Sequence, residues 1–213
     1  MDGAAPGWLY ESLMRLLRAR RSVRRYASAP VTDAMLDRLF EAARLAPSAH
    51  NRQPWRFARV TDGADKDRLA RAMGDRLRAD RLRDGDAAAD IERDVARSHA
   101  RIAGAPALVV VCLTLEDMDA YPDPRRNAAE RAMAAQSVAM AAQNLLLAAE
   151  ADGLAACWMC APLFCPETVA ATLDLPAGWE PQALITLGRA SGPPPRPRGR
   201  KGLAEIARRA GAR

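Results

Sequence analysis

The spacing of apolar and polar residues divides the chain into helices and strands. Apolar residues three and four positions apart predict helices over residues 8–17 and 33–45, the second beginning after Thr32 and ending before Pro47. Further helices are predicted over 62–98, with a break near Gly85, and over 128–151, 166–173 and 203–209. Short continuous apolar runs predict buried strands over 57–60, 106–113, 154–160 and 183–187. Because helices and strands alternate without regular βαβ units, the pattern predicts an α+β fold.

Length and composition narrow the class of protein. The chain has 213 residues, 49% of them hydrophobic, and no internal repeat or linker divides it, so we expect one domain over residues 1–213. The N-terminus has no pattern of a signal peptide, and the apolar run over 107–113 is too short to cross a bilayer. We therefore expect a cytoplasmic protein that does not act at a membrane.

The charged, aromatic and sulfur-containing residues argue against several functions. A net charge of +6 fits an anionic ligand, but the aromatic residues are few and are not interleaved with the basic ones, so no nucleic-acid partner is expected. Only two histidines are present, which argues against a histidine metal cluster, and four cysteines in a cytosolic chain are expected to be free thiols. We expect no metal.

Residues 46–57 form a polar loop between a predicted helix and a predicted strand. The loop carries the Ser48 hydroxyl and the Asn51 amide, and Pro47 and Pro54 restrict its backbone. Amide groups with few titratable neighbours favour recognition of a polar heterocycle over acid–base chemistry. An ordinary connecting loop with polar caps is the alternative.

Arginines gather in two segments near the ends of the chain. The first, Arg20-Arg-Ser-Val-Arg24, follows the first predicted helix, and the second lies in an extended arm over 192–213. The arm carries Arg196, Arg198 and Arg200. Guanidinium groups pair bidentately with phosphate oxygens, so both segments could hold a phosphate. For the first segment, a solvated basic helix end that suits the helix dipole is the alternative.

Two further segments each allow two interpretations. Residues 62–98 are dense in arginine and aspartate, which is typical of solvated surface helices, but helices over 76–101 could also form a lid that meets an acidic substrate. Cys157 and Cys160 have the spacing of a redox or metal-binding pair. Since they lie in an apolar run and no second pair has zinc-ribbon spacing, packed structural cysteines are favoured.

The sequence lacks the motifs of several large enzyme classes. It contains no glycine-rich dinucleotide loop, no Walker loop and no Gly-x-Ser-x-Gly elbow. The two arginine segments and the amide loop together suit a phosphorylated heterocyclic cofactor, with arginines on the phosphate and amides on the ring edge. We expect no catalytic side chain, because such a cofactor carries the chemistry itself.

These segments resemble those of the nitroreductase family of FMN-dependent oxidoreductases. The likeness rests on the first arginine segment, on Ala46-Pro-Ser-Ala-His-Asn-Arg-Gln-Pro-Trp55, on Gly153-Leu-Ala-Ala-Cys-Trp-Met159, and on Arg198-Gly-Arg200 followed by Leu203 and Glu205. Within the family, residues 174–181 and 76–101 are most similar to the C-terminal reductase domain of the bifunctional γ-glutamyl ligase that builds the deazaflavin coenzyme F-420.

The resemblance implies an intertwined homodimer with a central, mainly antiparallel sheet flanked by helices and with FMN at the subunit interface. It implies that nine residues bind the cofactor: Arg20, Arg21, Ser22, Arg24, Ser48, Asn51, Cys160, Arg198 and Arg200. It also implies hydride transfer from a donor such as NAD(P)H to a nitroaromatic, a quinone, a conjugated alkene or an acidic deazaflavin precursor, which arginines of the 76–101 region would suit. A flavin- or deazaflavin-binding module without turnover and a basic nucleic-acid binder are the alternatives.

Overall fold

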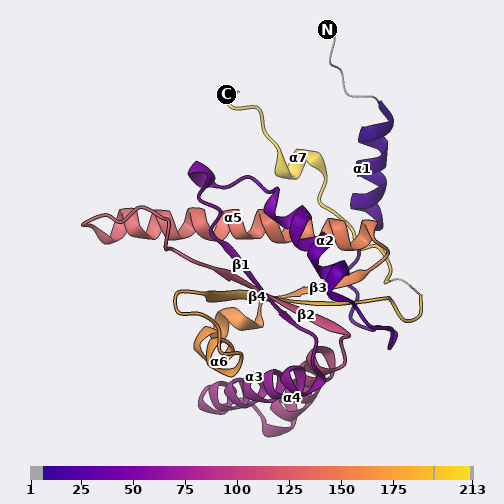
Figure 1. Ribbon diagram of the computed structural model, residues 1–213, viewed down its shortest axis with the longest axis vertical. Helices are drawn as coiled ribbons and strands as arrows, with labels where there is room; N and C mark the ends of the chain where they lie inside the picture. Colours follow the sequence, from indigo (N-terminus) through magenta and orange to yellow (C-terminus); the bar gives the residue numbers. More distant parts are fainter. Residues whose placement is uncertain (1–6, 194, 212–213) are drawn as a thin grey trace.

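A four-stranded antiparallel sheet forms the centre of the computed structural model, which describes residues 7–193 and 195–211 (Figure 1). The strands are β1 (Trp55–Val60), β2 (Ala107–Leu113), β3 (Ala155–Met159) and β4 (Glu180–Gly188), and they lie in the order β1-β2-β4-β3. Each neighbouring pair is antiparallel. The predicted α+β class and the predicted antiparallel sheet are confirmed.

Helices cover both faces of this sheet (Figure 1). Helices α2 (Asp33–Arg44) and α5 (Pro124–Ala151) lie on one face, and α3 (Gly63–Arg83), α4 (Ala88–Ala103) and α6 (Pro166–Thr172) lie on the other. Because side chains alternate along a strand, β2 packs Val109 against the first face and Leu108 against the second, and all its residues are buried. Burial on both sides explains why this strand is a continuous apolar run.

Helix α5 is a core helix. Of the described residues, it is the helix with the length and composition to cross a membrane, but Val138 and Leu145 are buried against the sheet. Its first turn begins four residues before the predicted start at 128, because the Asp123 carboxylate accepts from the Arg126 N–H at 2.9 Å and Pro124 suits the first helical position.

A turn at Gly85 and a buried lysine shape the α3–α4 pair. The predicted break near Gly85 is confirmed, since α3 ends at Arg83 and Gly85 has φ +84°. Lys66 of α3 is buried, and its Nζ donates to the carbonyls of Ala105 at 2.8 Å and Pro106 at 3.0 Å, just before β2 begins. Lys66 thus fixes the helical pair to the sheet.

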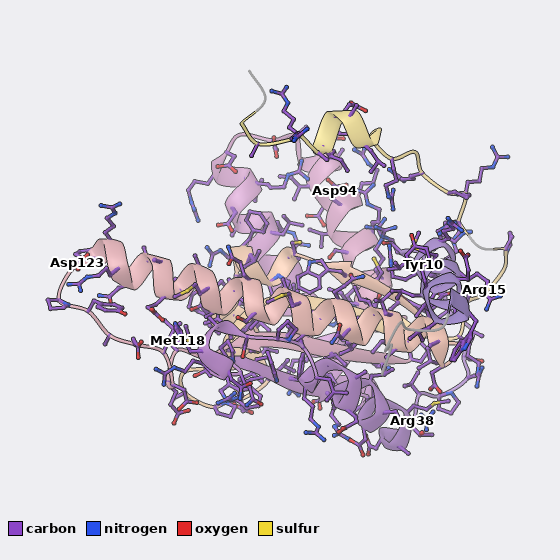
Figure 2. The ribbon with its side chains drawn as sticks, turned by 90° about the horizontal axis from the view of Figure 1, so that it is seen from above. Tyr10, Arg15, Arg38, Asp94, Met118 and Asp123 are labelled. Carbon is purple, nitrogen blue, oxygen red and sulfur yellow. The ribbon has the colours of Figure 1, made fainter. Side chains whose placement is uncertain are left out.

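The two ends of the described chain lie on the surface. Helix α1 (Gly7–Ala19) has no buried residue, and its Tyr10 and Arg15 lie near one end of α5 while Asp123 marks the other end (Figure 2). The C-terminal helix α7 covers only Leu203–Ile206, so the predicted extension to 209 is wrong. Residues 195–211 are exposed throughout, and a short helix without packing partners is unstable in water.

Candidate functional site

The two arginine segments line one cavity, which we call the basic cavity. It has a volume of about 1020 Å³ and lies between residues 17–25 and 191–200. Its arginines are Arg18, Arg20, Arg21, Arg24, Arg25, Arg196, Arg198 and Arg200. No acidic side chain lines it in the described part of the chain. The cavity therefore concentrates positive charge and suits a phosphate group.

The cavity arginines differ from most other arginines of the protein. None of the eight forms an ion pair with a carboxylate among the residues that the structure describes. Arg200, for example, donates only to the backbone carbonyls of Arg198 and Gly199, both at 3.3 Å. No carboxylate of the described residues compensates their charge, and a phosphate ligand would do so.

The sheet fixes the backbone of the first arginine segment. Val23 is buried, and its N–H donates to the Ala156 carbonyl of β3 at 3.1 Å, while Ser22 forms a β-bridge with the same residue. The second segment begins beside it, because the Ser191 N–H donates to the Arg25 carbonyl at 3.0 Å. Segments almost the whole chain apart in sequence thus meet at the outer edge of β3.

Tyr26 anchors the first segment, and sequence reasoning did not single it out. Its hydroxyl lies 2.7 Å from the Val23 carbonyl, 3.0 Å from the Thr186 carbonyl and 2.7 Å from the Thr186 Oγ1. Burial raises the pKa of Tyr26 far above its ordinary value, so the hydroxyl keeps its proton for these bonds. The one feature of the sequence that could have indicated this anchor is a tyrosine directly after an arginine run.

The amide loop lies outside the basic cavity. Neither Ser48 nor Asn51 lines the cavity; the Ser48 Oγ accepts from the Gln53 N–H at 3.0 Å, and Asn51 is exposed in the short 3₁₀ helix η1 (Ala49–Asn51). His50, Asn51 and Gln53 have φ of 49°, 55° and 51°, which costs about 1–3 kcal/mol each and is typical of functional loops. Within one chain, the described residues of the amide loop therefore do not share a cavity with the arginines.

Cys157 and Cys160 are not arranged as a redox pair. Cys157 is buried in β3, where desolvation raises the pKa of its thiol although Arg24 nearby opposes the shift. Cys160 is exposed beyond the strand end, and its sulfur accepts from the Trp158 indole N–H at 2.9 Å. Three residues of extended strand span about 10 Å, more than the 4.4–6.8 Å between Cα atoms that a disulfide needs. The structure places the two thiols as packing and surface groups.

Carboxylates of α3, of α4 and of the loop between them form ion pairs with the arginines that the sequence suggested for an acidic substrate. Arg76 pairs with Asp80 at 2.7 Å, Arg78 with Asp75 and Glu92 at 2.6 Å, Arg81 with Asp86 at 2.5 Å and Asp94 at 2.6 Å, and Arg83 with Asp80 at 3.4 Å. An acidic substrate would have to displace these carboxylates. We therefore assign none of these four arginines to the candidate site.

Metal binding has no support in the described residues. They contain no group of three His, Cys, Asp or Glu side chains that could hold a metal ion. The donors that the site offers are guanidinium, hydroxyl, amide and backbone groups, which suit an anionic organic ligand.

Comparison with known proteins agrees with this geometry. Residues 17–189 match the Nitroreductase family. The chain is 34% identical over 188 residues to a 5,6-dimethylbenzimidazole synthase from Rhodospirillum rubrum, covering 84% of this chain and 82% of that protein. It is 33% identical over 193 residues to an NADH dehydrogenase from Thermus thermophilus, covering 79% of this chain and 82% of that protein.

A solved structure adds the cofactor. A nitroreductase-like protein from Desulfovibrio desulfuricans, solved in complex with FMN, matches with a TM-score of 0.68 and 26% identity over 92% of this chain and 94% of its own. The family match spans the first arginine segment, the amide loop and all four strands. The chain belongs to the nitroreductase family and is an FMN-dependent oxidoreductase.

Proposed function

We propose that the basic cavity holds the FMN phosphate and that the protein passes a hydride from NAD(P)H to a small organic acceptor. The observation that carries the proposal is the group of eight arginines without carboxylate partners in the described chain. Arg20, Arg21, Arg24, Arg198 and Arg200 would pair with the phosphate oxygens, and the Ser22 hydroxyl would donate to them. FMN, when bound, supplies the hydride transfer.

Strand β3 gives the length needed for the rest of the cofactor. The phosphate site is bonded to Ala156, and Cys160 lies four residues further along, about 13 Å in an extended strand. A ribityl chain and a fused three-ring system can bridge that distance. The ring would then pass the backbone of Cys160.

A second copy of the chain would complete this site. Helix α1 exposes the apolar side chains of Trp8, Leu9, Tyr10, Leu13 and Leu17. A contiguous apolar helix face of this kind marks an interaction surface. The amide loop is strained and held in place, yet it lies away from the basic cavity of its own chain. We propose a homodimer in which the loop of one copy brings Ser48 and Asn51 to the flavin of the other.

Cofactor retention tests the phosphate site. The purified protein should be yellow, and the double variant Arg20→Ala/Arg200→Ala should lose the colour, because each charge-assisted hydrogen bond is worth about 1.5–3 kcal/mol. The matched control Arg125→Ala/Arg209→Ala removes two arginines outside the cavity and should keep the yellow colour. Colourless wild-type protein that does not take up added FMN would overturn the proposal.

Turnover separates the enzyme from a flavin-binding module. NAD(P)H should bleach the flavin absorbance rapidly, and a nitroaromatic or a quinone should restore it. A deazaflavin precursor, the acceptor suggested by the likeness to the F-420 ligase domain, belongs in the same series. Protein that binds FMN but is not bleached by either NADH or NADPH would be a binding module instead.

A further inference from the structure

A second cavity lies at the opposite end of β4 from the basic cavity. It has a volume of about 870 Å³, within the range of small-molecule sites, and we call it the Trp179 cavity. It opens where β2 ends and β4 begins, beside α6 and the 3₁₀ helix η2 (Ala161–Phe164). None of the residues implied by the family resemblance lines it.

The Trp179 cavity has apolar walls beside its polar groups. The apolar walls include Leu113, Leu115, Leu163 and Ala170 beside the half-buried indole of Trp179. A turn holds the backbone that carries the indole. The backbone N–H of Trp179 donates to the Pro176 carbonyl at 3.1 Å, and Gly178 has a φ of +83°, which suits only glycine well. A fixed aromatic ring among aliphatic side chains suits a planar ligand.

The charged groups of the Trp179 cavity are mainly acidic. Its lining contains the carboxylates of Glu116, Glu167 and Glu180 and the single guanidinium of Arg131. Arg131 is paired with Glu180 across the cavity wall, which leaves two carboxylates in excess. Arg56 approaches Glu116 only at 4.0 Å and does not line the cavity. The two cavities therefore have opposite charge.

The Trp179 cavity begins where the segment assigned to the flavin ring ends. Leu163, one of its wall residues, donates its N–H to the Cys160 carbonyl at 3.0 Å. A molecule in the cavity would lie beyond the ring end of FMN. The FMN phosphate would lie at the other end of β3. This order fits a bound acceptor better than a second phosphate-bearing molecule.

We propose that the Trp179 cavity binds a neutral or cationic planar aromatic molecule and, resting on the proposed function, that this molecule is the electron acceptor. In each turnover NAD(P)H would be oxidised to NAD(P)⁺, and a quinone in the cavity would take up the hydride and one solvent proton to become a hydroquinone. The excess carboxylates disfavour an anionic acceptor such as a deazaflavin precursor.

Binding of three probes with one ring system tests the charge preference without turnover. The probes are (4-nitrobenzyl)trimethylammonium, 4-nitrobenzamide and 4-nitrobenzoate, titrated calorimetrically into the oxidised, FMN-loaded protein. The cation should bind at least about tenfold more tightly than the anion at low salt, and added salt should reduce this ratio. Equal affinities, or tightest binding of the anion, would overturn the inference.

Variants locate the binding site. Trp179→Ala should weaken the binding of all three probes about tenfold or more, whereas Trp179→Phe, which keeps an aromatic wall, should retain most of the affinity. Glu167→Gln should lower the cation-to-anion ratio and Arg131→Gln should raise it. Glu150→Gln, at a carboxylate outside the cavity, is the matched control and should change nothing. Unchanged affinity in both Trp179 variants would place the probes elsewhere and overturn the inference.

The same measurements separate this inference from the proposed function. FMN content, measured by absorbance, should be equal in all these variants, because none of them alters the basic cavity. A protein that turns over but binds the probes without regard to Trp179 would refute the cavity alone. Trp179-dependent binding in a protein that NAD(P)H cannot reduce would support the ligand site and overturn its assignment as the acceptor site.

Discussion

Removing the Tyr26 hydroxyl should loosen the arginine segment from the sheet. In Tyr26→Phe the ring remains, but the Val23 carbonyl and the Thr186 hydroxyl each lose a partner at 2.7 Å. Leaving buried polar groups unsatisfied costs about 1–3 kcal/mol, and about 2 kcal/mol lowers the melting temperature of a chain of this size by roughly 4–8 °C. The same change should weaken FMN binding, since Val23 and Ser22 attach the segment to β3.

Thermal or urea unfolding and a flavin fluorescence titration measure the two effects of Tyr26→Phe. Tyr121→Phe, which removes a hydroxyl that forms no hydrogen bond in the described structure, is the matched control and should change neither quantity. Thr186→Val removes the other side of the contact, so the double variant should be less destabilised than the sum of the two single variants. A Tyr26→Phe protein as stable as the control, with normal FMN affinity, would refute this account of the anchor.

Three further predictions concern the remaining structure. Lys66→Met should lower the free energy of unfolding by about 2 kcal/mol in denaturant titrations because two carbonyls lose their donor, whereas exposed Lys201→Met should not. The hydrogen bond from Arg131 lowers the pKa of Glu180 below its ordinary 4.5. The pair therefore stabilises the fold above that pH, and this stabilisation is lost on acidification. In Arg131→Gln, the loss of thermal stability on acidification, measured by thermal melts, should be smaller. One thiol of the native protein should react with a disulfide reagent and none in Cys160→Ser, since Cys112, Cys157 and Cys165 are buried and burial raises the pKa of Cys112 to about 12.

Local patterns in the sequence predicted most elements because their causes lie within a few residues. The continuous apolar run at 107–113 is buried on both faces, and Thr32 caps α2 by accepting from the Met35 N–H at 3.3 Å. Helix α4 continues to Ala103, five residues past the predicted end at 98. The two other errors at helix ends have the same kind of cause. Asp123 and Pro124 start α5 earlier than its apolar spacing indicates, and α7 ends at Ile206 because its side chains are exposed and not packed against the rest of the described chain.

The residue types of the site were readable from the sequence, but their grouping was not. Arginine runs suggest a phosphate wherever they lie, and the resemblance to the nitroreductase family rests on those runs and on the amide loop. The arginine-rich composition of the 76–101 region also suggested that its arginines bind an acidic substrate. Only the ion pairs that these guanidiniums form within α3, with α4 and with the loop between the two helices distinguish them from the unpaired ones of the basic cavity.

The sequence by itself determined the α+β class, the chemistry of the ligand and the family, because these depend on residue type, spacing and motif. The tertiary structure alone decided that segments around Arg24 and Arg198 line one cavity, that Tyr26 anchors the first, and that the amide loop lies elsewhere. It also revealed the Trp179 cavity, whose wall combines residues 113–116, 131, 163, 166, 167, 170 and 177–181. Contacts between distant segments depend on the packing of the whole sheet, and no local pattern records them.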